Sequence, residues 1–285
     1  MLSVLTLVKN RTPQLHNLLN GLVTGEQLPN EVVVVVMGGT DPEPEIDVPQ
    51  LRMRYLRMNC GGLPLARARN LAARAACQEN LVFLDVDCIP SSQLISSYEN
   101  VLMNNDALCM GPVRYLDTNF DNDIGDQSEL ESRSRPHPNR VSPIERPVSQ
   151  SSHYELFWSL SFALRSTTWN RLGGFDELFT GYGGEDTDFA FTARQHGLPL
   201  MWVRDALAFH QYHQTYDPPL QHFDAIVANA GRFWRKWRTW PMEGWLTAFA
   251  KIGLIAWSPD RSSIDILRAP SSLEIEAAKI TEARR

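Results

Sequence analysis

The carboxylates of Asp85-Val86-Asp87 have the spacing to share one ligand. They follow the apolar run 81–84, which is typical of a buried strand, and open α/β sheets bind ligands at the carboxyl ends of such strands. Hard oxygen ligands at this edge suit Mg²⁺ or Mn²⁺, which completes its coordination with diphosphate oxygens. A solvated strand end or a helix cap is the alternative, and taken alone the pair is a weak signal.

A second acidic group, Gly183-Gly184-Glu185-Asp186-Thr187-Asp188, opens a predicted helix over 185–196. Carboxylates in a first turn are favoured by the helix dipole by about 0.3–1 kcal/mol each, and one of them can be an N-cap. The paired glycines, however, let another molecule approach the backbone closely. A carboxylate kept ionised there is suited to accept a proton from a hydroxyl.

Two histidines stand near the end of a later apolar strand, at His210 and His213. A lone histidine in such a place is more often an ordinary hydrogen-bonded side chain than a ligand. If the strand ends beside Asp87, however, a neutral imidazole would complete a carboxylate and diphosphate shell around the cation.

The elements that must position these residues alternate in type. Apolar runs at 2–8, 32–37, 51–58 and 81–84 predict strands. Helices are predicted between them, one at 63–78 and one from the helical spacing of Leu15, Leu18, Leu19 and Leu22. This alternation predicts an α/β fold with a mainly parallel central sheet flanked by helices. Further strands are expected at 156–164, 200–203 and 206–210, and further helices at 166–172, 185–196, 220–239 and 245–257.

The segment 117–152 differs in composition from the rest. Its 36 residues include six apolar residues and four prolines, too few apolar groups to order it strongly. We expect a flexible loop that is either a functional lid or disordered.

The charge and cysteines exclude several classes of protein. The net charge of −6 over 285 residues, with both signs mixed, disfavours nucleic acid as a partner. The four cysteines lack metal-ligand spacing and are too few to stabilise a chain of this length by disulfide bonds, so we expect a cytoplasmic protein with reduced thiols.

No apolar stretch approaches the length of a membrane span. Trp234, Trp237 and Trp240 share one face at the end of the helix over 220–239. They either pack on the protein or make a peripheral membrane contact through 232–257.

Several blocks together resemble a known family from residue 2 to residue 213. They are Asn10-Arg11, Ala68-Arg69-Asn70, Phe83-Leu84-Asp85-Val86-Asp87, Gly173-Gly174-Phe175-Asp176-Glu177 and Gly181-Tyr182-Gly183-Gly184-Glu185-Asp186. In this order they resemble a family 2 glycosyltransferase of the GT-A fold, and the last two are similar to its galactosyltransferase-type C-terminal motif.

The resemblance implies metal-dependent, inverting transfer of a sugar from a nucleotide-diphospho-sugar, with UDP as the first expectation, to an acceptor hydroxyl. The acceptor would be a saccharide, a lipid-linked molecule or another hydroxyl compound. Asp186 would be the catalytic base, and Asp87 and His210 would bind Mn²⁺ or Mg²⁺, with His213 as the alternative to His210. Asn10, Arg11, Arg69 and Asp85 would bind the donor, and Tyr182, Glu185 and Asp188 the acceptor.

One departure concerns recognition of the base. The family usually has an acidic pair after the second strand, where this chain has Gly38-Gly39-Thr40-Asp41. Asp41 is then the candidate carboxylate for the nucleotide base.

The resemblance also divides the chain. Residues 1–257 would form one GT-A domain with a nucleotide-sugar half (1–115), the loop or lid (117–152), an acceptor and catalytic half (153–215) and a C-terminal helical extension (216–257). Residues 258–285 would be a polar, frayed tail.

Three other functions remain open. A retaining GT-A transferase and a non-catalytic sugar-binding protein with a degenerate site would use the same fold. A haloacid-dehalogenase-type phosphatase shares the strand and aspartate pair, but Ile89 replaces its usual Thr or Val, the aspartate strand comes fourth, and the glycine-rich block would have no role.

Overall fold

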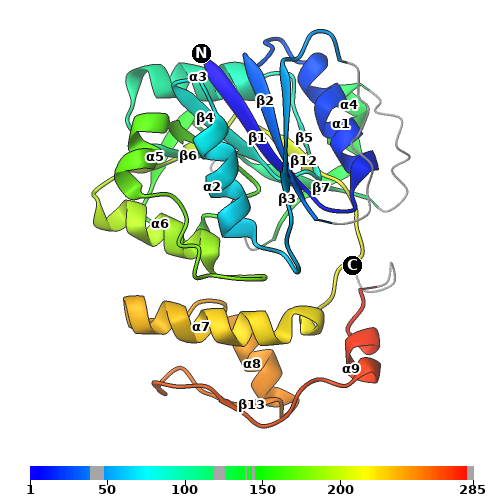
Figure 1. The fold of residues 1–285 in the computed structure, drawn as a ribbon, viewed down its shortest axis with the longest axis vertical. Helices are drawn as coiled ribbons and strands as arrows, with labels where there is room; N and C mark the ends of the chain where they lie inside the picture. Colours follow the sequence, from blue (N-terminus) through cyan, green and yellow to red (C-terminus); the bar gives the residue numbers. More distant parts are fainter. Residues whose placement is uncertain (39–47, 118–125, 139, 141, 143–144, 281–285) are drawn as a thin grey trace.

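Four parallel strands form one half of the central sheet (Figure 1). The computed structural model describes all residues except 39–47, 118–125, 139, 141, 143–144 and 281–285. Strands β1 (Leu2–Val8), β2 (Glu31–Met37), β3 (Met53–Met58) and β4 (Asn80–Leu84) pair in the order β3-β2-β1-β4. The predicted βαβ pattern is therefore confirmed in this half.

Helices cover both faces of these strands because consecutive side chains point to opposite sides. Leu5 and Val33 belong to one core with α2 (Leu65–Ala75), whereas Val4 and Val32 belong to another with α1 (Thr12–Val23). The near-continuous apolar runs thus reflect burial on both faces.

The other half of the sheet is mixed in direction. It continues β4-β10-β6-β11-β9, with β10 (Ser161–Arg165), β6 (Leu108–Met110), β11 (Leu200–Val203) and β9 (Val148–Ser151). Strands β10 and β9 run antiparallel to their neighbours, so six of the eight described strands share one direction. The strand expected from residue 156 begins only at Ser161, because the 3₁₀-helix η1 (Tyr154–Leu156) and a turn at residues 159–160 precede it.

A second, four-stranded sheet lies at the carboxyl end of β4. It has the order β5-β12-β7-β8, from β5 (Cys88–Pro90), β12 (Ala208–His210), β7 (Val113–Leu116) and β8 (Ser134–Pro136). The antiparallel pairing of β5 with β12 sets His210 opposite Cys88. This register brings His210 next to Asp87 in space, although they are far apart in sequence.

The segment 117–152 is not a loop throughout. Its described residues include α4 (Gln127–Ser132), β8 and β9. Arg140 is buried and donates hydrogen bonds to the carbonyl oxygens of Leu156 (3.2 Å) and Gly111 (3.3 Å), which ties the segment to the domain. Closure of this segment over a donor stays a prediction.

The chain ends in a layer of helices beneath the sheet (Figure 1). After η2 (Leu220–His222), the layer contains α7 (Phe223–Trp237), α8 (Glu243–Lys251), β13 (Ile255–Ala256), β14 (Asp265–Ile266) and α9 (Ser272–Ala277). The prediction of a frayed tail over 258–285 is wrong for its described residues, because α9 begins with a capping box between Ser271 and Glu274. The helices that complete the fold are α3 (Leu94–Asn104), α5 (Ser166–Leu172) and α6 (Glu185–Gln195).

The tryptophans of the helical layer pack against protein. Trp240 is buried, its ring stacks on Trp234 at 5.6 Å, and its indole N–H donates to the carbonyl oxygen of Arg261 at 2.9 Å. The Trp237 indole N–H donates to Asp188. Of the two interpretations of this aromatic face, packing is the one that the structure shows.

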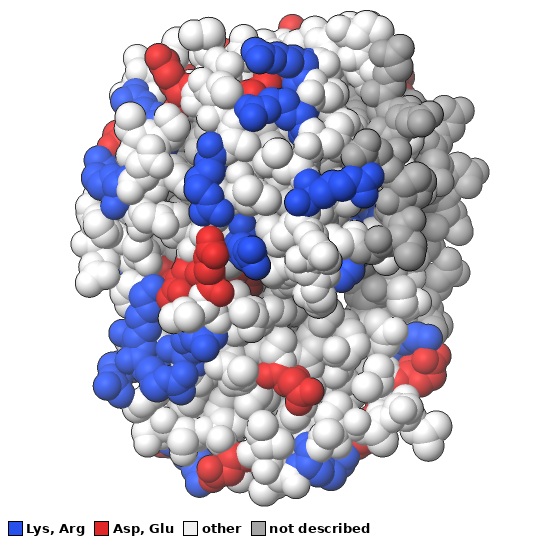
Figure 2. All heavy atoms as spheres, in the orientation of Figure 1, with Lys and Arg blue, Asp and Glu red and all other residues white. Residues whose placement is uncertain are grey.

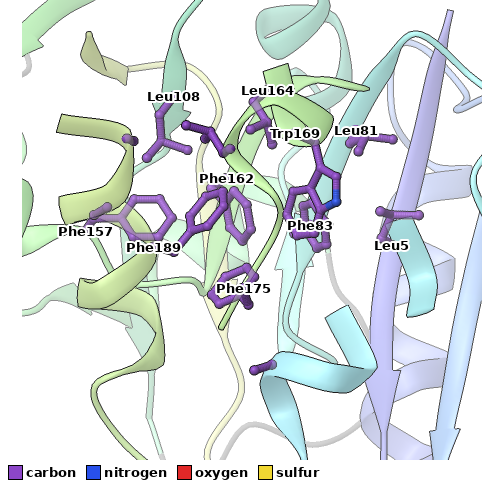
Figure 3. Close-up of a cluster of buried hydrophobic side chains, with 14 of the residues drawn as sticks. Leu5, Leu81, Phe83, Leu108, Phe157, Phe162, Leu164, Trp169, Phe175 and Phe189 are labelled. Atoms are coloured by element: carbon purple, nitrogen blue, oxygen red, sulfur yellow. The ribbon is translucent and has the colours of Figure 1, made fainter. Parts of the chain in front are cut away.

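An aromatic core joins the sheet to the loop that precedes α6 (Figure 3). Phe83 of β4 stacks on Phe162 of β10 at 4.4 Å between ring centroids, and Phe175 stacks on Phe189 of α6 at 4.5 Å. Trp169 lies between the two pairs, 4.8 Å from Phe83 and 5.8 Å from Phe175. These ring contacts fix the position of the start of α6 relative to β4.

Asn70 of α2 fixes the same loop by hydrogen bonds. Its Oδ1 accepts from the Phe175 N–H at 2.9 Å, and its Nδ2 donates to the Phe175 carbonyl at 2.8 Å. Gly174 makes this approach possible, because a Cβ there would lie 2.5 Å from Asn70 Oδ1.

We predict that Gly174→Ala destabilises the protein by about 2–3 kcal/mol, from left-handed backbone strain plus the broken Asn70 contacts. Gly173→Ala is the matched control: its φ is also positive, at +82° against +75°, but nothing lies within 4 Å of its added Cβ. It should cost only about 1 kcal/mol. Urea unfolding measures both, and equal losses would contradict a structural role for the Asn70 contacts.

Candidate active site

Asp87 stands at the centre of a group of possible metal ligands. Its Oδ1 lies 3.5 Å from His210 Nε2, and its Oδ2 lies 3.4 Å from His213 Nε2. One ligand atom from each of the three residues can be chosen so that all lie within 4.8 Å of one another. Both histidines therefore lie beside Asp87, whereas the sequence analysis expected either His210 or His213 to do so.

The donor set fits a divalent cation. A carboxylate oxygen and two imidazole nitrogens are ligands that Mn²⁺ accepts, with diphosphate oxygens able to complete the shell. Asp87 Oδ1 is buried and has no hydrogen-bond partner among the described residues. Burial alone would raise the pKa of Asp87, but His210, Arg11 and His213 outweigh it and hold the pKa below its usual value. These neighbours thus keep the carboxylate ionised.

Hydrogen bonds of Gln211 fix the strand end that carries His210. The Gln211 N–H donates to the Asp87 carbonyl at 2.7 Å, and Gln211 Oε1 accepts from Asn17 Nδ2 of α1 at 2.7 Å. Sequence analysis missed both Gln211 and Asn17, and the sequence held no signal for either beyond the nearby histidines.

Arg69 of α2 connects the Asp85-Val86-Asp87 turn to α6. Its guanidinium lies 3.2 Å from Asp85 Oδ1 and 3.2 Å from Glu185 Oε1, and its side chain is 4% exposed. Although burial would lower the pKa of Arg69, the carboxylates of Asp85 and Glu185 raise it. Burial raises the pKa of Asp85, and Arg69 offsets only part of that effect.

Asp186 is a half-buried carboxylate in the first turn of α6. Burial first, and then the charge of Glu185, raise its pKa to about 7. The Thr187 N–H donates to Asp186 Oδ1 at 2.7 Å, which orients the group. A carboxylate that titrates near neutrality can accept a proton efficiently under physiological conditions.

Asp188 and Glu185 are occupied by protein contacts. Asp188 is buried and accepts hydrogen bonds from Lys236 Nζ (2.9 Å to Oδ2) and Trp237 Nε1 (2.7 Å to Oδ1) of α7. Asp188 thus joins α6 with α7, and its expected role in acceptor binding stays a prediction. The buried Glu185 carboxylate likewise pairs with Arg69 and positions that arginine.

The glycine-rich loop before α6 is held from the helical layer by Asn229, which sequence analysis missed. The buried Asn229 amide of α7 donates to the carbonyl oxygens of Thr180 (3.0 Å) and Gly183 (2.9 Å). A Cβ on Gly183 would lie 2.7 Å from Met242 Sδ, so the loop and the helical layer approach closely.

Tyr182 of this loop stacks on aromatic rings of the helical layer. Its ring centroid lies 4.6 Å from that of His222 and 5.9 Å from that of Trp245, and the residue is 36% exposed. This gives an accessible aromatic surface four residues before Asp186 in the chain.

The other residues predicted to bind the donor are Asn10 and Arg11, which follow β1, and Asp41. Asn10 is exposed with a φ of +52°, and Arg11 pairs with Asp87. Asp41 lies outside the described residues. Figure 2 shows acidic atoms gathered where the sheet domain meets the helical layer, bordered by basic side chains.

Comparison with protein families gives a match over residues 28–197 to the family described as glycosyltransferase like family 2. The match covers more than half of the chain. The chain belongs to glycosyltransferase-like family 2.

Curated relatives of this family 2 chain are larger than it is. It is 27% identical over 272 residues to validoxylamine A glucosyltransferase of Streptomyces hygroscopicus subsp. limoneus, covering 83% of this chain and 56% of that protein. It is 28% identical over 184 residues to hyaluronan synthase of Pasteurella multocida, covering 57% of this chain and 19% of that protein. The chain thus spans about half the length of the glucosyltransferase.

Solved structures show that the fold is GT-A. The structure of S. aureus TarS 1-349 in complex with UDP-GlcNAc aligns with a TM-score of 0.58 at 15% identity, covering 80% of this chain and 65% of that one. GalNAc-T7 with UDP, GalNAc and Mn²⁺ aligns with a TM-score of 0.57 at 14% identity, covering 75% and 43%. No helix in the described part of this chain is long and apolar enough to cross a membrane.

The pKa of Asp186 predicts a pH-dependent effect on stability. Because it is raised from 3.8 to about 7 in the folded protein, the folded state binds more protons between these values, and stability falls as pH rises through this window. Asp186→Asn removes this half-buried charge, so we expect it to stabilise the protein by about 1–2 kcal/mol at pH 8 and by almost nothing at pH 4.

Thermal unfolding at both pH values measures this difference. Asp260→Asn, which removes one exposed negative charge, is the control and should show little change at either pH. A gain for Asp186→Asn that is no larger at pH 8 than at pH 4 would mean that Asp186 is not held under strain as a charged group.

Proposed function

We propose that this chain transfers a sugar from a nucleotide-diphospho-sugar to an acceptor hydroxyl with inversion at the anomeric carbon. The observation that carries the proposal is the contact of the Arg69 guanidinium with both Asp85 and Glu185. Asp85 is two residues from Asp87 of the cation-binding group, and Glu185 precedes Asp186, the proposed proton acceptor. The relatives named as a glucosyltransferase and a hyaluronan synthase support this class of reaction.

In this mechanism Asp186 takes the proton of the acceptor hydroxyl. The acceptor oxygen forms a bond to the anomeric carbon while the bond from that carbon to the diphosphate oxygen breaks. Asp85, oriented by Arg69, would bind the nucleotide ribose. A divalent cation held by Asp87, His210 and His213 would neutralise the charge of the leaving diphosphate.

We propose a UDP-sugar as the donor and a saccharide or a related ring compound as the acceptor. Structures of the same fold bind UDP-GlcNAc or UDP, which supports the nucleotide but not the sugar. The partly exposed Tyr182 ring supports an acceptor with an apolar ring face, because aromatic side chains offer such faces large contact area.

We predict that Asp186→Asn lowers the turnover of sugar transfer by at least about 10³-fold while UDP affinity changes little, because the amide keeps the shape but cannot accept the proton. The rate of the wild-type protein should fall as pH drops below about 7, where Asp186 becomes protonated. Product formation with a panel of UDP-sugars, together with calorimetry of UDP binding, measures both effects.

The anomeric configuration of the product, read by NMR, tests the stereochemistry in the same experiment. Asp260→Asn should retain full turnover. Retention of configuration, or normal turnover by Asp186→Asn, would remove Asp186 from the role of base.

We predict that Asp87→Ala, His210→Ala and His213→Ala each weaken Mn²⁺ binding in the presence of UDP, by about tenfold or more, because each removes one of few protein ligands. Asp87→Ala should have the largest effect, since it removes the only carboxylate of the group. His213→Ala should have the smallest, since its side chain is 26% exposed against 11% for His210.

Electron paramagnetic resonance of free Mn²⁺ gives the affinities. His196→Ala, an exposed histidine at the end of α6, is the control and should bind as the wild type does. Unchanged affinity in Asp87→Ala would place the cation elsewhere.

A further inference from the structure

Arg11 occupies part of the cation-binding group. It lies at the N-terminal end of α1, and its Nη1 pairs with Asp87 Oδ2. The N-terminal end of a helix repels a cation, and the first turn of α1 contains no acidic residue. Asp87 is the carboxylate that compensates the Arg11 charge in the described part of the chain.

The guanidinium and a metal ion would compete for the negative charge of the Asp87 carboxylate. Asp87 Oδ2, which pairs with Arg11, is also the oxygen that lies 3.4 Å from His213 Nε2. The Asp87 side chain is 6% exposed, so water screens little of the repulsion between two positive charges held on it. Arg11 in this position therefore disfavours a divalent cation.

A nucleoside diphosphate would relieve this competition. The Arg11 side chain is 35% exposed, so it has room to leave Asp87 for an anion entering from solvent. Guanidinium groups bind phosphate oxygens by paired hydrogen bonds. Such an anion would also add oxygen ligands for the cation, which favours both binding events.

We propose that Arg11 makes cation and nucleotide binding depend on each other. Without nucleotide, Arg11 compensates the buried Asp87 charge and lowers the affinity for a divalent cation. With a nucleoside diphosphate bound, Arg11 pairs with the diphosphate and Asp87 becomes available to the cation. This inference rests on the cation site of the proposed function, and it assigns Arg11 as the residue that couples the two binding events.

The test is the Mn²⁺ affinity measured with and without UDP for Arg11→Gln and Arg11→Lys. In the absence of UDP, Arg11→Gln should bind Mn²⁺ about fivefold more tightly than the wild type, because the competing charge is gone. Arg11→Lys keeps the charge and should stay near the wild-type affinity. The gain in Mn²⁺ affinity that UDP produces should be smaller in Arg11→Gln than in the wild type.

Lys9→Gln is the matched control, because it removes a neighbouring positive charge whose Nζ contacts the Gly62 carbonyl at 2.5 Å instead of Asp87. It should leave Mn²⁺ affinity unchanged. Unchanged or weaker Mn²⁺ binding by Arg11→Gln, or equal tightening by Lys9→Gln, would overturn the role of Arg11 while leaving the cation site intact. Wild-type Mn²⁺ affinity in Asp87→Ala would instead overturn both this inference and the cation site of the proposed function.

Discussion

The buried guanidinium of Arg69 is the interaction on which the arrangement of the candidate active site depends. A charge with a 4% exposed side chain is tolerated only when opposite charges and hydrogen bonds compensate it. Asp85 follows β4 and Glu185 opens α6, so compensation requires these two elements to meet at α2. The same contact places Asp186, the neighbour of Glu185, near the end of β4, and the charge of Glu185 helps to raise the Asp186 pKa to about 7.

The helical layer completes the site from the other side of α6. Lys236 and Trp237 of α7 hold the buried carboxylate of Asp188, and Asn229 holds the backbone of the preceding loop. Four of the five acidic residues at this helix start and at the β4 end pair with basic side chains, namely Asp85, Asp87, Glu185 and Asp188. Residues of α7 thus help to support the loop that precedes α6, and the Trp237 indole contributes to that contact.

The two charged groups of the site differ in how they are balanced. Arg69 lies between two carboxylates and is fully enclosed, which suits a permanent structural bridge. Arg11 pairs with one carboxylate, that of Asp87, and remains partly exposed, which suits a contact that can be exchanged for a ligand. A rigid bridge beside an exchangeable pair allows the site to change its ligands without moving α2 or α6.

The sequence by itself determined the βαβ half, the family and the chemical types of the site residues, because strand periodicity and motif spacing are local properties of the chain. It also indicated that His210 could lie beside Asp87, and His210 Nε2 lies 3.5 Å from Asp87 Oδ1 in the structure. Only the tertiary structure decided the partners. Asp188 is buried against Lys236 of α7. Both histidines reach Asp87 because β12 pairs with β5, whose residues are more than a hundred positions away in the chain. The helix in the expected polar tail begins with a local capping box between Ser271 and Glu274, whereas only non-local packing revealed Asn229.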